Sequence, residues 1–391
     1  MSEPIKKINP VPESYSPKAK PEILSMVARD IIPATVDELQ SYILSGGEPP
    51  KSKKIAGIRR LWHDDKSENF QLEGCFAAVM KAVGEPADFN CALFEAVSGT
   101  LFTHLYNFTG THGLSAVVGH QLMPHIFRQI GYSYFYIDQE TILKHYELVL
   151  AAIKTAVVKG IPVISGGIGN IQLADRIHKH HEQWCNIGGY DENNILYVNA
   201  FPDDLPVDEN GYCTVKNGLN KSSGLYIINK KLHDITVSEI CRRAIKSIPA
   251  LISLPLYNGI SFGQKAYYDW ADRLIDDNNM KNLCDDPYKG FLWQGHNAPW
   301  INALTCECHM RVFYDRIAEL SGLSEAPKVK EIYTRIYENL PEIQRIHGGD
   351  FFAAVSVISK PETRKELAAV LCRMGDLHNE LFKLFDEDKS K

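Results

Sequence analysis

The hydrophobic period of the chain changes twice, and this change constrains the fold more than any single motif. Residues 70–158 carry apolar side chains mostly at helical spacing, ending in a long amphipathic segment at 141–158. Between 161 and 228 the apolar runs are short and separated by turn residues, as in β-strands. From about residue 235 the helical period returns and continues to the end. Helices followed by a run of strands predict an α+β fold.

Four strands are expected in the middle segment, at 161–165, 184–188, 194–199 and 224–228. The connection 190–194 reads Tyr-Asp-Glu-Asn-Asn, which is turn chemistry suited to a hairpin. We therefore expect the second and third strands to be antiparallel neighbours.

Composition excludes several classes of protein. The chain has 391 residues, of which 45% are hydrophobic and 23% charged, as in an ordinary soluble globular protein. A net charge of -6 gives no electrostatic footprint for nucleic acid. No apolar run approaches the length of a membrane span, and the first seven residues lack a signal-peptide pattern, so we expect a cytoplasmic protein without a membrane partner.

The cysteines do not indicate disulfides or a metal centre. Nine are scattered along the chain, an odd number in mostly apolar periodic segments. The sequence Cys306-Glu307-Cys308-His309 lacks a second ligand pair of matching spacing and has helical periodicity, so we interpret it as core packing. No metal and no cofactor is predicted.

Three parts are expected along the chain: an N-terminal arm, helix and basic linker at 1–68, a catalytic domain at 69–234, and a helical domain at 235–391. In the first part, Thr35-Val36-Asp37-Glu38 is a capping box that predicts a helix start. The basic linker is a candidate dock for an acidic partner, and its charged residues are Lys51, Lys53, Lys54, Arg59 and Arg60.

Cys75 is the first candidate for chemistry. It follows Gly74, and residues 76–83 are good helix formers, which places the thiol at the start of a helix. Unpaired backbone N–H groups and the helix dipole favour a thiolate there. A small buried core residue is the alternative interpretation of Cys75.

A cysteine nucleophile needs a base and a group that orients that base. His180 and His181 immediately precede the strand at 184–188, and Asn199 ends the following strand. A histidine at the beginning of one strand and an amide at the end of its hairpin partner would be neighbours across the sheet. For the oxyanion, Gln71 is the preferred side-chain donor and Asn69 its rival, together with a backbone N–H.

These motifs together resemble the butirosin-biosynthesis-H-like branch of the papain/C39-like superfamily, over roughly residues 70–385. Each motif alone is weak, and their order carries the resemblance. The matching segments are Leu72-Glu73-Gly74-Cys75-Phe76-Ala77-Ala78, residues 96–102, Lys159-Gly160-Ile161-Pro162-Val163, Gly188-Gly189-Tyr190-Asp191 and Leu196-Tyr197-Val198-Asn199.

The resemblance implies a papain-like (C39- or transglutaminase-like) domain with an N-terminal cysteine helix and an antiparallel sheet, followed by an all-helical C-terminal domain. It also implies that the cysteine moves an acyl group from a carrier-protein thioester to a small amine, forming an amide in natural-product biosynthesis, as in closthioamide-type assembly.

The chain departs from the family pattern in two places. The usual histidine position, six residues before the Gly of Gly-Tyr-Asp, holds Gln183. His181 is two residues earlier and keeps the same side of a regular strand, whereas a bulge would favour His180. The usual strand-end Asp is replaced by Asn199, with Asp203 as a rival.

We therefore expect a cysteine acyltransferase in which Cys75 attacks the thioester, Gln71 stabilises the oxyanion, and His181, oriented by Asn199, serves as base. A cysteine peptidase or amidase, which transfers the acyl group to water, is one alternative. A non-catalytic ligand-binding protein on the same fold is the other.

Overall fold

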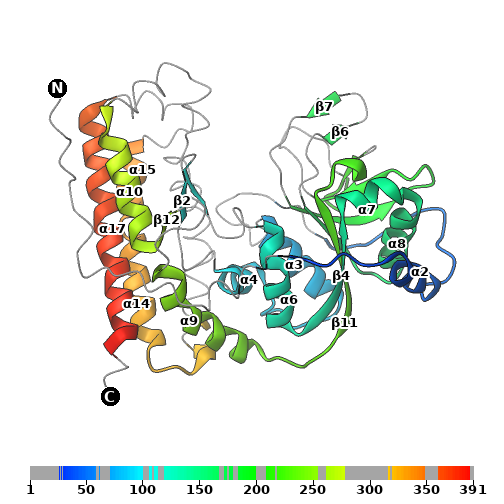
Figure 1. Cartoon of the computed structure of the whole chain (residues 1–391), viewed down its shortest axis with the longest axis horizontal. Coiled ribbons are helices and arrows are strands. Elements are labelled where there is room, and N and C mark those ends of the chain that lie inside the picture. The colour runs from blue at the N-terminus through cyan, green and yellow to red at the C-terminus, as the bar shows by residue number, and fades with distance from the viewer. Residues whose placement is uncertain are drawn as a thin grey trace. The chain divides into compact units, whose positions relative to one another are not determined.

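The computed structural model of the chain is shown in Figure 1. The structure describes residues 26, 28, 30–58, 61, 71–99, 105–107, 110–112, 119–166, 171–173, 176–178, 184–199, 208–215, 218–253, 261–277, 316–317, 319–347 and 360–387. Contacts divide the chain into two compact units. The sheet unit comprises residues 27–98 and 118–237, and the helical unit comprises residues 1–26, 99–117 and 238–391.

An antiparallel sheet forms the centre of the sheet unit. Its strands lie in the order β10-β9-β8-β5-β11-β4, and β1 pairs with the end of β8. The bounds are β1 Lys53–Lys54, β4 Tyr132–Asp138, β5 Val163–Gly166, β8 Cys185–Tyr190, β9 Leu196–Val198, β10 Cys213–Val215 and β11 Gly224–Lys231. A separate pair consists of β6 Ile171–Leu173 and β7 Arg176–His178. The predicted combination of helices with an antiparallel sheet is confirmed.

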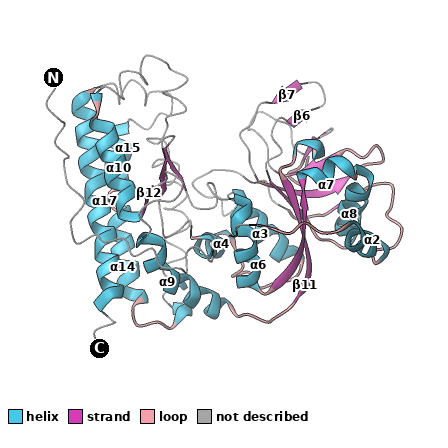
Figure 2. Ribbon diagram, in the orientation of Figure 1, coloured by secondary structure: helices cyan, strands magenta, loops and turns pink. Residues whose placement is uncertain are grey.

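Helices cover both faces of this sheet (Figures 1 and 2). On one face lie α3 (Gln71–Ala82), α4 (Cys91–Ser98) and α6 (Met123–Ile130), and on the other lie α2 (Val36–Leu44), α7 (Gln139–Lys144) and α8 (Tyr146–Val158). The first three helices share an aromatic core, because Phe76 packs against Phe94 and Phe127 at ring-centroid distances of 5.0 and 5.2 Å. This core joins α3 to α4 and α6.

Local signals in the sequence are confirmed where side chains satisfy nearby backbone groups. The Thr35 side chain accepts a hydrogen bond from the Glu38 N–H, and Glu38 accepts one from the Thr35 N–H, which completes the capping box. In the turn from β8 to β9, Asp191 Oδ1 accepts from the N–H groups of Asn193 and Ile195, both at 2.8 Å. The predicted hairpin of β8 and β9 is therefore present.

The expected single helix over 141–158 is wrong. Asp138 caps α7 by accepting a hydrogen bond from the Thr141 N–H, and the chain then breaks at His145, whose φ and ψ are -128° and 43°. Leu143, in α7 before the break, is 59% exposed. Two shorter helices replace one long helix.

The helical unit is built mainly from α9 (Val237–Ser253), α10 (Gly263–Ile275), α14 (Ala326–Tyr337), α15 (Leu340–His347) and α17 (Pro361–Glu387). Proline is the first residue of α17, a position where its fixed φ suits the helix and its missing N–H costs no hydrogen bond. Strands β12 (Ser261–Phe262), β2 (Leu105–Asn107) and β3 (Gly110–His112) form a small antiparallel sheet. Because β12 lies within 235–391, the prediction that this region is all-helical is wrong.

The helices of this unit are joined by buried aromatic packing and by ion pairs. His378 of α17 lies against the rings of Tyr267 and Tyr333, at 5.0 and 6.0 Å between ring centroids. Arg335 and Glu380 form a two-pronged ion pair at 2.6 and 3.0 Å. Across the described ranges, no helix combines the length and apolarity that crossing a membrane requires.

Candidate functional site

Cys75 lies inside α3 and not at its beginning. The helix starts at Gln71, so the cysteine is its fifth residue, and the predicted position at the helix start is wrong. Leu72 and Glu73 are each 1% exposed, and their burial holds the first turn in place despite the poor helix propensity of Gly74. Cys75 itself has no exposed surface.

Burial controls the ionisation of this thiol. Desolvation raises the pKa of Cys75 well above its ordinary value, and the neighbouring Cys185 thiol and Glu73 carboxylate raise it further. Glu73 is held in place by a hydrogen bond that its Oε1 accepts from Ser98 Oγ at 2.8 Å. Burial therefore opposes the thiolate that the predicted position at the helix start would favour.

Two asparagines connect Cys75 to the sheet. Asn186 of β8 donates from Nδ2 to the Cys75 carbonyl oxygen at 3.2 Å. Asn199, directly after β9, accepts at Oδ1 from the Asn186 N–H at 2.8 Å and donates from Nδ2 to Asn186 Oδ1 at 3.2 Å. Both asparagine side chains are fully buried. We call Cys75, Asn186 and Asn199 the cysteine–asparagine cluster.

Asn186 is the member that the sequence analysis missed. It is the second residue of a strand in which all six residues are buried, and its side chain reaches α3. A buried amide must find hydrogen-bond partners, so an asparagine within an apolar strand was the available signal. The structure thus brings Cys75 and Asn199 to the same place and inserts Asn186 between them.

The remaining predicted site residues are placed only in part. Gln71 is the first residue of α3, but its side chain lies outside the described part of the structure. The candidate bases His180 and His181 and the positions Asn69, Gln183 and Asp203 also lie outside the described residues. The same holds for residues 306–309, and no group of three metal-ligating side chains occurs in the described ranges. The cysteines within those ranges form no disulfide bond.

The basic linker is only partly available to a partner. Lys54 forms an ion pair with Asp208, and its ammonium lies 4.2 Å from the centre of the Tyr197 ring. Lys51 and Lys53 are exposed. Arg59 and Arg60 lie outside the described residues. Lysines 51 and 53 are therefore the part of the predicted dock that the structure leaves open to solvent.

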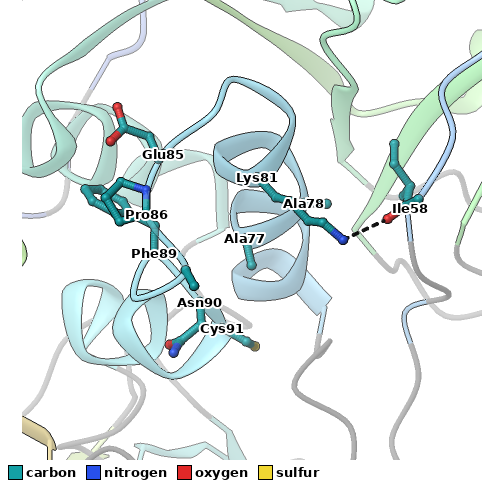
Figure 3. Close-up of a pocket in the computed structure, with 11 residues that line it drawn as sticks. Ile58, Ala77, Ala78, Lys81, Glu85, Pro86, Phe89, Asn90 and Cys91 are labelled. Atoms are coloured by element: carbon teal, nitrogen blue, oxygen red, sulfur yellow. Dashed lines mark hydrogen bonds between the residues drawn. The ribbon is translucent and has the colours of Figure 1, made fainter.

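A half-open cavity of about 360 Å³ lies beside α3 and the beginning of α4 (Figure 3). At its rim, Lys81 Nζ donates to the Gly57 carbonyl oxygen at 3.4 Å. Glu85, also on the lining, pairs with Lys231 at 2.8 Å and accepts a hydrogen bond from the Tyr132 hydroxyl. Cys75 does not line this cavity. A ligand bound there would therefore not face the candidate nucleophile.

The chain matches no protein-family model, and the comparison with curated proteins gave no relative.

Proposed function

We propose that the chain is a cysteine acyltransferase built on a papain-like domain, in which Cys75 carries the acyl group. One observation supports this proposal above the others. The cysteine–asparagine cluster joins the helix of the candidate nucleophile to the start of β8 and the end of β9. In a cysteine enzyme of this type, those two strands carry the base and the residue that positions it.

The reaction begins with a neutral thiol, because burial raises the Cys75 pKa. A base must take the Sγ proton as the sulfur attacks the thioester carbonyl. The bond from Sγ to the acyl carbon forms, the carbon–sulfur bond of the donor breaks, and the departing thiolate receives the proton. An amine then attacks the acyl carbon and gives a proton to the base, the bond from the acyl carbon to Sγ breaks, and the Cys75 sulfur receives that proton. Thioesters are already activated, so these reaction steps consume no nucleotide.

We assign the base to His181, three residues before Trp184 in the segment that leads into β8. Asn199 contributes as a positioning residue, since its amide holds the first residues of that strand. The acyl donor we propose is a thioester on an acidic carrier protein, which would dock on the exposed Lys51 and Lys53.

A second function is favoured by one specific observation. Cys75 has no exposed surface, so an acyl group reaches Sγ only if a neighbouring segment moves. A non-catalytic ligand-binding protein requires no such movement. In that case Cys75 would be a structural thiol, and the cysteine–asparagine cluster would serve stability alone.

The test is amide formation from simple acyl thioesters, such as acyl-N-acetylcysteamines, and a panel of primary amines, followed by mass spectrometry of the products. The acyltransferase proposal expects product with the wild-type chain and with Cys91→Ala, a matched variant at another buried cysteine. It expects none with Cys75→Ala. Release of the free acid instead of the amide would identify a hydrolase. No turnover by the wild-type chain would support the binding protein.

Docking is tested separately with an acidic carrier protein. Exchange of Lys51 and Lys53 for glutamate is expected to weaken carrier binding and raise KM for the carrier-bound donor, without changing turnover of the small thioester. Lys54→Ala is the control, because the charge of Lys54 is already paired with Asp208. If Lys54→Ala weakened carrier binding as much as the exchange of Lys51 and Lys53, the result would argue against docking at these two lysines.

A further inference from the structure

A histidine outside the cysteine–asparagine cluster is held between two hydroxyl groups. His120 lies on the short 3₁₀ helix η1 (Gly119–Leu122) in the sheet unit. Its Nε2 is 2.8 Å from Ser223 Oγ, and its Nδ1 is 2.8 Å from the Tyr226 hydroxyl. Ser223 directly precedes β11, and Tyr226 lies within that strand. This is the spacing of a nucleophile, a base and a group that orients the base.

Gly166 and Gly224 lack the side-chain atoms that would collide with His120 and its neighbours. A Cβ atom on Gly166 would lie 2.6 Å from both His120 Cε1 and Ser223 Oγ. A Cβ on Gly224 would lie 3.0 Å from His120 Cε1. Any larger residue at Gly166 would force the imidazole and the hydroxyl apart. The glycine at the end of β5 is therefore part of the arrangement.

The pair is partly accessible, in contrast to the adjacent serine. Ser223 and His120 are both half-buried. Ser222 is fully buried, and its hydroxyl is engaged with Ser165 Oγ at 2.9 Å and with the Gly166 and Gly224 carbonyl oxygens. Of these two consecutive serines, only Ser223 both reaches solvent and contacts the imidazole.

The imidazole is held in its neutral form, in which one ring nitrogen can accept a proton. Burial lowers the pKa of His120 to about 4, so the ring is neutral at physiological pH and has one nitrogen lone pair. With the proton on Nδ1, the ring donates to the Tyr226 oxygen and accepts the Ser223 hydroxyl proton at Nε2. The rings of Trp184 and Tyr136 flank it, at 4.9 and 5.9 Å between centroids, and contribute to its burial.

We propose that Ser223 and His120 form a nucleophile–base pair that accepts acyl groups from activated carboxylic esters and releases them to water. Ser223 Oγ bonds to the acyl carbon while its proton passes to His120 Nε2. The ester bond to the leaving group breaks, and the imidazole returns the proton to that group. Water, deprotonated by the same nitrogen, then cleaves the acyl-serine and restores the hydroxyl. Tyr226 is a positioning residue, and the pair acts independently of Cys75.

The first test is covalent labelling of the full chain with a fluorophosphonate probe, followed by peptide mapping. The expected result is one adduct on Ser223. His120→Gln should lower the labelling rate by about 100-fold, the usual contribution of a general base. Ser222→Ala should still be labelled at Ser223. Absence of a Ser223 adduct in the folded wild-type chain, or equal labelling of His120→Gln, would overturn the proposal.

The second test is the pH dependence of that labelling. Between pH 8 and pH 5 the wild-type rate should stay flat, because His120 remains neutral over this range. In Tyr226→Phe the labelling rate should fall, because the imidazole loses its Nδ1 partner. For the same reason, the pH at which the rate falls to half on the acid side should change. A purely structural role for Tyr226 would reduce the fraction of folded protein and leave the midpoint unchanged. A wild-type rate that falls between pH 7 and pH 6 would contradict the buried, neutral base.

Discussion

Replacement of Asn199 by alanine tests the cysteine–asparagine cluster as a structural unit. The change removes the acceptor of the Asn186 N–H and the donor to Asn186 Oδ1, at 2.8 and 3.2 Å in the intact protein. Asn186 has no exposed surface, so water cannot replace either partner. Each buried polar group left without a partner costs about 1–3 kcal/mol. We therefore expect the free energy of unfolding to fall by about 2–6 kcal/mol for the two groups together.

The assay is urea unfolding combined with hydrogen exchange of peptides that cover β8, because exchange reports on this strand separately from the helical unit. Asn210→Ala is the control, since among the described residues the Asn210 side chain makes an exposed contact with Glu209 at 3.4 Å. It should change stability by less than about 0.5 kcal/mol. A loss below about 1 kcal/mol in Asn199→Ala would refute the view that the two asparagines satisfy each other.

Three further predictions concern single side chains. The pKa of His125 is lowered to about 4, chiefly by burial, so the unfolded chain binds a proton first as the pH falls. Between pH 7 and pH 5, stability measured by urea unfolding should drop by about 2 kcal/mol from this residue, and His125→Gln should reduce that slope. Gly166→Ala should abolish fluorophosphonate labelling of Ser223, because the new methyl group displaces both members of the pair. Gly188→Ala places a Cβ 2.7 Å from Tyr212 Cζ and should destabilise the fold by roughly 1–3 kcal/mol in thermal melting, while unchanged melting would show that the ring moves freely.

The β8–β9 hairpin was predictable because its cause lies within a few residues. Asp191 satisfies two nearby backbone N–H groups, and Asn194 adopts a φ of 63°, which asparagine tolerates better than most residues. The capping box at Thr35 is local in the same sense. Such signals need no knowledge of the rest of the chain.

The environment of Cys75 was not predictable in this way. Its burial depends on β8, which lies more than a hundred residues later, and on the packing of Leu72 and Glu73. Helix propensity alone predicted that the helix would begin after Gly74. In the structure the helix begins at Gln71, and tertiary contacts stabilise this additional first turn. For the same reason, the sequence predicted a lowered pKa for the Cys75 thiol, whereas burial raises it.

The arrangement around His120 could also not be predicted from the sequence. Its parts come from η1, the end of β5 and the start of β11, three segments whose proximity depends on the sheet order. Neither His120 nor Ser223 belongs to a recognisable motif. Asn186 differs from these two residues, because an amide within an apolar strand was visible in the sequence.

If Cys75 accepts an acyl group, the acyl-enzyme itself can be detected. The wild-type chain would be incubated with an acyl thioester in the absence of amine, and its intact mass and tryptic peptides measured. The account predicts a mass increment of one acyl group on the peptide that contains Cys75, retained in Cys91→Ala and absent from Cys75→Ala. An unmodified Cys75 peptide in the folded wild-type chain, at saturating thioester, would contradict it.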